Sequence, residues 1–101
     1  MKIRIINDKS FQITEQGGDA GSFETKQFST PVGNIEVAQS CYPEIRYFDY
    51  KIIVFVRGIY EWKDNNMLQA NKPEHMPHIL KALEKFCTFN EEPFEIESCI
   101  I

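Results

Sequence analysis

The sequence predicts an α+β fold, a single domain in which one mainly antiparallel sheet of five to seven strands is covered by one helix. Three patterns predict it. Much of the chain alternates apolar and polar residues with a period of two, which is typical of half-buried strands. Residues 77–89 have the spacing of an amphipathic helix, and residues 91–101 return to a period of two. The helix is therefore expected to pack across the sheet and to precede a C-terminal strand.

Length and composition favour a single unit. The 101 residues contain no internal repeat, low-complexity segment or linker, so we expect one globular domain over residues 1–101. An apolar share of 43% and an aromatic share of 13% suffice for a small core without metal or disulfides.

The first part of the chain predicts four strands. The first two should form a hairpin around residues 7–9, because Asn and Asp adopt turn conformations easily. The glycine-rich segment 17–21 is expected to be a loop. The four strands are expected over residues 2–6, 10–15, 22–28 and 34–40.

The longest apolar region has its centre at residues 50–56. β-Branched and aromatic side chains dominate this segment, which favours a strand over a helix. Both of its alternating faces are apolar, so it predicts a central strand covered on both sides. A turn at residues 64–66 should then lead to a short strand at residues 67–69.

The helix has clear boundaries in the sequence. Pro77 suits the first helical turn, where its missing N–H costs nothing, and Asn90 is expected to cap the C-terminus. We expect its apolar face to pack on Ile52, Val54 and Val56 of the sheet. That face consists of Met76, Ile79, Leu80, Leu83, Phe86 and Cys87.

The C-terminal strand combines an apolar face with an acidic one. Its alternation predicts that Phe94, Ile96 and Ile100 point to the core. The acidic residues are Glu91, Glu92, Glu95 and Glu97, and no basic residue lies among them. Catalytic carboxylates occur as partners in a cleft, which an open strand does not provide. The pattern instead predicts a docking surface for a basic partner or, in the simpler alternative, the solvated face of an edge strand.

Aromatic residues add a second candidate contact. Many Tyr and Phe side chains lie between residues 42 and 62, and most are expected in the sheet. Tyr60 and Trp62 lie near a strand end, where large amphipathic side chains are favoured interface anchors. We therefore include both in the predicted partner-binding surface.

Net charge limits the classes of partner. The formal charge is −4 and the pI is about 5.1, which disfavours direct nucleic-acid binding, although Lys2, Arg4 and Lys9 cluster near the N-terminus. The sequence contains no apolar run long enough for a signal peptide or a membrane span. A cytoplasmic protein without membrane contact is expected.

The three cysteines do not form a recognisable motif. Cys41, Cys87 and Cys99 are odd in number and widely spaced, which favours neither a disulfide framework nor a zinc site. They are expected to be reduced and mostly buried, as small apolar side chains.

The two histidines are also weak evidence for chemistry. His75 and His78 are three residues apart, but Pro77 lies between them and no metalloprotease motif is present, so we expect surface histidines. The segment 17–21 lacks the spacing of a phosphate-binding loop. We therefore expect no metal, no cofactor and no enzymatic activity.

These observations favour a small acidic inhibitor that binds and neutralises a basic macromolecule. An immunity-type protein, or antitoxin, directed against a bacterial nuclease toxin has this profile, and so has a viral inhibitor of a host defence enzyme. The alternatives are an oligomeric small-molecule or nucleotide-binding protein, a small enzyme, and a structural role in an assembly.

Overall fold

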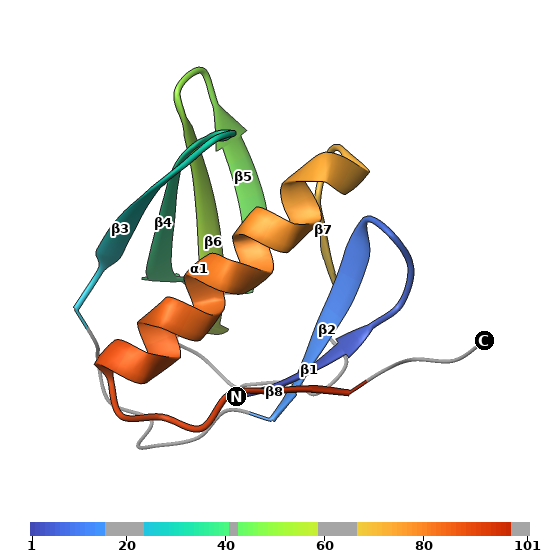
Figure 1. Ribbon diagram of the computed structural model, residues 1–101, viewed down its shortest axis with the longest axis vertical. Coiled ribbons are helices and arrows are strands. Elements are labelled where there is room, and N and C mark those ends of the chain that lie inside the picture. The colour runs from blue at the N-terminus through green and yellow to red at the C-terminus, as the bar shows by residue number, and fades with distance from the viewer. Residues whose placement is uncertain (16–23, 41–42, 59–66, 98–101) are drawn as a thin grey trace.

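The computed structural model describes residues 1–15, 24–40, 43–58 and 67–97. Within these ranges the chain forms eight strands, one short 3₁₀ helix and one α-helix (Figure 1). The elements are β1 (Lys2–Ile5), β2 (Ser10–Glu15), β3 (Lys26–Thr30), β4 (Gly33–Ser40), β5 (Glu44–Phe48), β6 (Lys51–Gly58), β7 (Met67–Gln69), η1 (Pro73–His75), α1 (Met76–Phe89) and β8 (Glu95–Glu97).

The strands form two four-stranded sheets. Sheet A has the order β7-β2-β1-β8, and sheet B has the order β3-β4-β6-β5. Four of the strand pairs are antiparallel, whereas β1–β8 and β4–β6 are parallel. The α+β class is therefore confirmed, but the expected single sheet of five to seven strands is wrong. The division into two sheets reflects long-range pairing. β1 pairs with β2 on one side and, on the other side, with β8 from the other end of the chain.

The helix lies between the two groups of strands. Figure 1 shows α1 crossing the molecule diagonally, with β3 to β6 on one side and β1, β2 and β8 on the other. The predicted contact is confirmed, because the buried face of α1 belongs to the same apolar cluster as Ile52, Val54 and Val56. Sheet A adds Ile3, Phe11 and other side chains to that cluster, so one core joins both sheets and the helix.

Sheet A confirms the predicted N-terminal hairpin. Strands β1 and β2 pair antiparallel, and Ile3, Phe11 and Ile13 are fully buried. The expected short strand at residues 67–69 is also present, as β7, paired with β2. The expected C-terminal strand is present as β8, Glu95–Glu97, and residues 98–101 lie outside the described part of the chain.

Sheet B contains the predicted central strand. β6 lies between β4 and β5, and Ile52, Val54 and Val56 face the core. The opposite face carries Ile53 and Phe55, which are half-buried, so the expected full cover on both faces is wrong for that side. The third strand also lies later than expected, since β3 ends at Thr30, just before the turn at Pro31.

The helix agrees closely with the sequence pattern, and its C-terminus is well defined. Asn90 caps α1, and its side-chain amide donates a hydrogen bond to the Phe86 carbonyl over 2.9 Å. The Glu92 N–H donates to the Cys87 carbonyl over 2.8 Å, and the Glu91 N–H donates to the Thr88 carbonyl over 3.2 Å. These two bonds form a Schellman motif, which requires a left-handed residue at its centre. Glu91 adopts this conformation, with φ 56°.

Candidate functional site

The acidic C-terminal segment lies at an edge of sheet A. β8 pairs with β1 on one side, and no described strand pairs with its other side. Glu95 and Ile96 are both exposed, with 45% of Ile96 accessible. Ile96 is in register with the buried Ile3, so it lies on the core side of the sheet as expected. Its edge position leaves it exposed, and it was expected to be buried.

Basic residues of β1 accompany the acids of β8. The register places Lys2 opposite Glu95 and Arg4 opposite Glu97. The Arg4 guanidinium lies 3.8 Å from the Glu97 carboxylate, and both side chains are substantially exposed. Exposed pairs of this kind contribute little to stability. The neighbouring strand therefore supplies the bases that the segment itself lacks, and the acidic surface is partly neutralised.

The other two glutamates differ in exposure. Glu91 is exposed at the end of α1. The Glu92 side chain is only 9% exposed and lies 3.8 Å from the ammonium group of Met1, which also donates a hydrogen bond to the Pro93 carbonyl. Glu92 thus acts as an internal partner of the chain's first residue. The accessible acids of this surface, which we call the acidic edge, are Glu91, Glu95 and Glu97.

The remaining predicted contact residues lie outside the described part of the chain. Tyr60 and Trp62 belong to this group, as do Cys41 and Cys99. The predicted loop at 17–21 and turn at 64–66 lie outside it as well.

Cys87 is the cysteine that the structure describes. It is fully buried on α1, as expected for a small apolar side chain. Burial, assisted by the nearby Glu92 carboxylate, raises the pKa of the thiol to about 11, although the N-terminal ammonium acts in the opposite direction. At neutral pH the side chain is a thiol, which is a poor nucleophile.

His75 does not behave as a simple surface histidine. Its ring stacks on Tyr47 with centroids 5.4 Å apart, and its Nδ1 lies 3.0 Å from the Tyr47 hydroxyl. The Asn71 N–H donates to the same hydroxyl over 3.0 Å, so the tyrosine O–H can donate to Nδ1. Burial raises the pKa of Tyr47, while the Asn71 hydrogen bond acts to lower it. The sequence gives no sign of the contact between Tyr47 and His75, because the two residues are 28 positions apart.

The Tyr47–His75 pair links β5 to η1 and lines a pocket of about 320 Å³. Asp49 and Lys51 lie in the same lining, so the pocket has charged groups of both signs. The pair orients the segment before α1, since the tyrosine hydroxyl holds both a backbone N–H and an imidazole.

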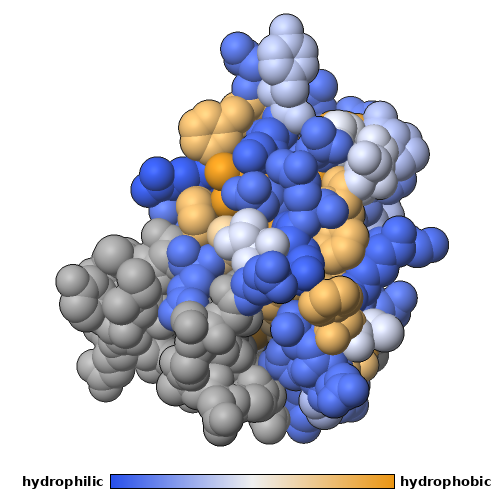
Figure 2. Space-filling model, turned by 90° about the vertical axis from the view of Figure 1, so that its left-hand side faces the viewer, coloured by the Kyte–Doolittle hydropathy of each residue, from blue (hydrophilic) through white to orange (hydrophobic). Residues whose placement is uncertain are grey.

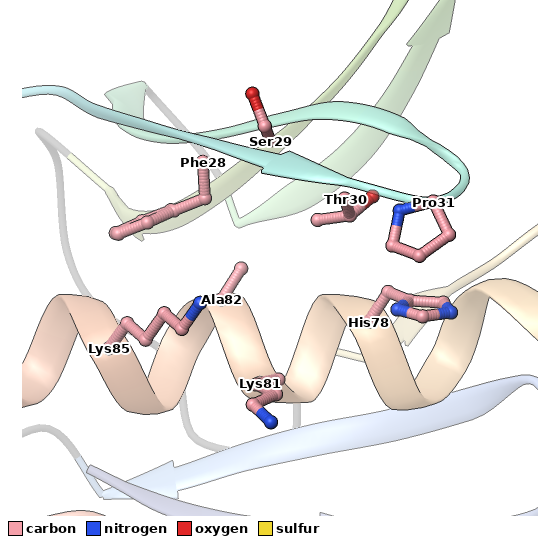
Figure 3. A pocket seen from close by; sticks show the side chains of 8 residues that line it. All are labelled: Phe28, Ser29, Thr30, Pro31, His78, Lys81, Ala82 and Lys85. Carbon is pink, nitrogen blue, oxygen red and sulfur yellow. The ribbon is translucent and has the colours of Figure 1, made fainter.

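His78 lies in a different pocket, between β3 and α1. This pocket has a volume of about 300 Å³, and Figure 3 shows strand and helix running side by side around it. Lys81 and Lys85 belong to its lining together with His78. We did not predict this site, although their helical spacing of three to four residues was a signal that could have indicated a shared face.

Metal binding and membrane insertion find no support among the described residues. These residues contain no group of three or more His, Cys, Asp or Glu side chains that could hold a metal ion. Within the same ranges, no helix is long and apolar enough to cross a membrane.

Comparison with known proteins gives no family for the chain. It matches no protein-family model, no curated protein and no solved structure. Function is therefore inferred from the residues and surfaces of this chain alone.

Proposed function

We propose that the protein binds a basic macromolecule through the acidic edge and acts as a small inhibitor. The observation that carries this proposal is the position of β8, which ends sheet A and leaves Glu95 and Ile96 exposed on opposite faces of the same edge strand. Charge and apolar area together are what a protein contact uses, because charge orients the encounter and buried apolar area slows dissociation.

The arrangement of the edge suits a basic protein segment. Glu91 and Glu95 provide two exposed carboxylates. Glu97 provides a third, because its ion pair with Arg4 is weak. A Lys or Arg from a partner can compete for Glu97, because an exposed pair at 3.8 Å holds it loosely. A nuclease toxin has the required basic surface, since it must bind phosphates, and a host defence nuclease has it for the same reason.

An inhibitory role needs no chemistry from this chain. The one described thiol is buried and protonated at neutral pH, and the ring nitrogen Nδ1 of His75 faces the Tyr47 hydroxyl. We therefore propose a binding role without catalysis, in which the partner supplies any enzymatic activity.

A second candidate function is the binding of a small molecule or nucleotide. The pocket beside Tyr47 and His75 favours it, because about 320 Å³ lies within the range of small-ligand sites. A rise in melting temperature with a nucleotide panel, abolished by Tyr47→Phe, would support this role. The inhibitor proposal predicts no such rise.

The test of the inhibitor proposal is affinity capture with a charge-matched control. One variant replaces Glu91, Glu95 and Glu97 by Gln, and Glu92 is left intact because its side chain is only 9% exposed and lies near the ammonium group of Met1. The control replaces three exposed acids elsewhere, in the substitutions Asp8→Asn, Asp49→Asn and Glu74→Gln. Both variants remove three negative charges, so they differ only in the position of the change.

Basic proteins captured from a cell lysate are quantified by mass spectrometry at low and at high salt. We expect the acidic-edge variant to recover its specific partner about tenfold less well, with a flatter salt dependence. The control should resemble the wild type. Equal recovery by all three proteins would contradict the proposal.

A further inference from the structure

β3 forms an edge of sheet B, and no described strand pairs with its outer side. On its inner side it pairs with β4. The register closes a two-residue turn at Thr30 and Gly33, so these two residues exchange backbone hydrogen bonds. Because hydrogen-bonding direction alternates along a strand, the backbone N–H and C=O groups of Gln27 and Ser29 point away from β4.

A groove lies beside this open edge. Phe28, Thr30 and Pro31 come from the strand side, and Figure 3 shows these side chains directed towards the helix. Ala82 and His78 are on the facing side of α1. In the same view the Ser29 side chain points away from the helix, so the interior of the groove is mainly apolar.

The helix side of the groove is basic in a chain that is acidic as a whole. Lys81 and Lys85 are exposed, and neither forms an ion pair with a residue that the structure describes. Successive helical residues are rotated by about 100°, which places Lys85 within about 20° of His78 and Lys81 about 60° to one side, with Glu84 about 60° beyond Lys81. Figure 2, which looks onto the side of the molecule where β3 lies, shows small apolar patches separated by hydrophilic side chains.

We propose that the groove between β3 and α1 binds an extended acidic peptide segment of another protein, as a fifth strand of sheet B. The peptide backbone would pair with Gln27 and Ser29, one apolar side chain would enter the groove, and carboxylates would approach Lys81 and Lys85. Extended peptides bind to other domains in this way, with the backbone providing affinity and pockets providing specificity.

Three features favour a peptide over a small anion. The groove follows a strand of five residues, and at about 3.3 Å per residue this length accommodates roughly five residues of ligand. The pocket interior is apolar, which suits a side chain better than a free phosphate. The outward backbone groups that no described strand pairs lie along the edge of β3, where a phosphate would reach only one or two of them.

The proposal is tested with a defined probe, the peptide acetyl-Glu-Thr-Leu-Thr-Glu-amide. Alternation in a strand places its two glutamates and its leucine on one face. Titration into ¹⁵N-labelled protein should shift the amide signals of Gln27 and Ser29 in a saturable way. The double variant Lys81→Gln/Lys85→Gln should weaken binding about tenfold, as should a peptide with Gln in place of Glu.

Two matched controls separate the groove from general charge. The variant Lys9→Gln/Lys72→Gln removes the same charge outside the groove and should bind like the wild type. The variant Gln27→Pro removes an N–H that points away from β4, which an edge strand tolerates, and should abolish binding. A peptide methylated at its backbone nitrogens makes the same test from the ligand side, so the result does not depend on how well Gln27→Pro folds.

The contradicting results are specific. Absence of saturable shifts at Gln27 and Ser29 would overturn the proposal. Equal binding of the methylated peptide, with displacement by millimolar inorganic phosphate, would show a small-anion pocket. Dimerisation of the wild type that the double lysine variant abolishes would show that a second copy of the chain occupies the groove.

Discussion

The edge of sheet A at β8 is acidic, and the groove beside the edge of sheet B at β3 is basic. The charges of the two edges come from different parts of the chain. The acids of the β8 edge lie within and just before the strand itself. The bases beside β3 belong to α1, more than fifty residues away in the chain. The comparison shows that an overall charge of −4 is a poor guide to this surface, because tertiary packing separates the two signs.

The largest expected effect concerns the core that both edges share. Leu83 is fully buried on α1 in the cluster that joins sheets A and B. Leu83→Ala should destabilise the protein by about 2–5 kcal/mol, measured by chemical denaturation. Glu84→Ala, at the exposed neighbouring position, should change stability by less than about 0.5 kcal/mol.

The same experiment tests whether sheets A and B unfold together. If one core supports both edges, Leu83→Ala should lower the stability of both sheets together, in a single transition. Separate transitions for signals from sheet A and sheet B would show that the edges belong to independently folding parts.

The second expected effect is a loss of stability at alkaline pH, caused by the Cys87 thiol near the end of α1. The pKa of Cys87 is raised to about 11 in the folded protein from the ordinary value of 9.0. A raised folded-state pKa contributes stability that is complete below pH 9 and is lost as the pH rises towards 11. The loss should amount to about 2–3 kcal/mol.

Denaturation at several pH values for the wild type and Cys87→Ala checks this effect. The variant lacks the thiol and should lose less stability over the same pH range, whatever its stability at neutral pH. Identical pH dependence of the two proteins would show that Cys87 is not responsible.

The smallest effect sharpens the role of the acidic edge. Glu91 has φ 56°, in the left-handed region that costs an L-residue about 1–2 kcal/mol and glycine almost nothing. Glu91→Gly should therefore raise stability by about 1 kcal/mol while removing one acidic charge. Thermal denaturation measures the gain, and Glu91→Ala, which keeps the strained backbone, should not show it. Weaker partner binding by the more stable Gly variant would separate charge from folding.

The sequence predicted the parts of the fold that depend on local pattern. The period of Ile79, Leu83 and Phe86 identified α1 to within one residue, and alternation identified the hairpin of β1 and β2. It could not predict the parallel pairings of β1 with β8 and of β4 with β6, because a period of two defines a buried face but not the neighbouring strand. This is why two sheets were taken for one.

The candidate site was likewise predictable where it depends on local sequence and not where it depends on long-range contacts. The acidic edge was predicted as an exposed group, since its residues are close together in the chain, but the separate environments of Glu92 and Glu97 were not predicted. Glu92 is paired with the ammonium group of Met1, and Glu97 is paired with Arg4. Both partners come from the other end of the chain. The Tyr47–His75 contact and the β3–α1 groove were missed because each joins segments that only folding brings together.

The central claim is that the two edges select partners of opposite charge independently of net charge. The most direct measurement is the binding of two fluorescent peptides, Glu-Thr-Leu-Thr-Glu and Lys-Thr-Leu-Thr-Lys, to the wild type and to two variants. One variant replaces Glu91, Glu95 and Glu97 by Gln, and the other replaces Lys81 and Lys85 by Gln. Each variant should weaken only the peptide of opposite charge to the edge that it alters, by about tenfold. If both variants instead change the affinity for both peptides in proportion to net charge, the charges act as a diffuse field, and the claim of two separate docking edges is contradicted.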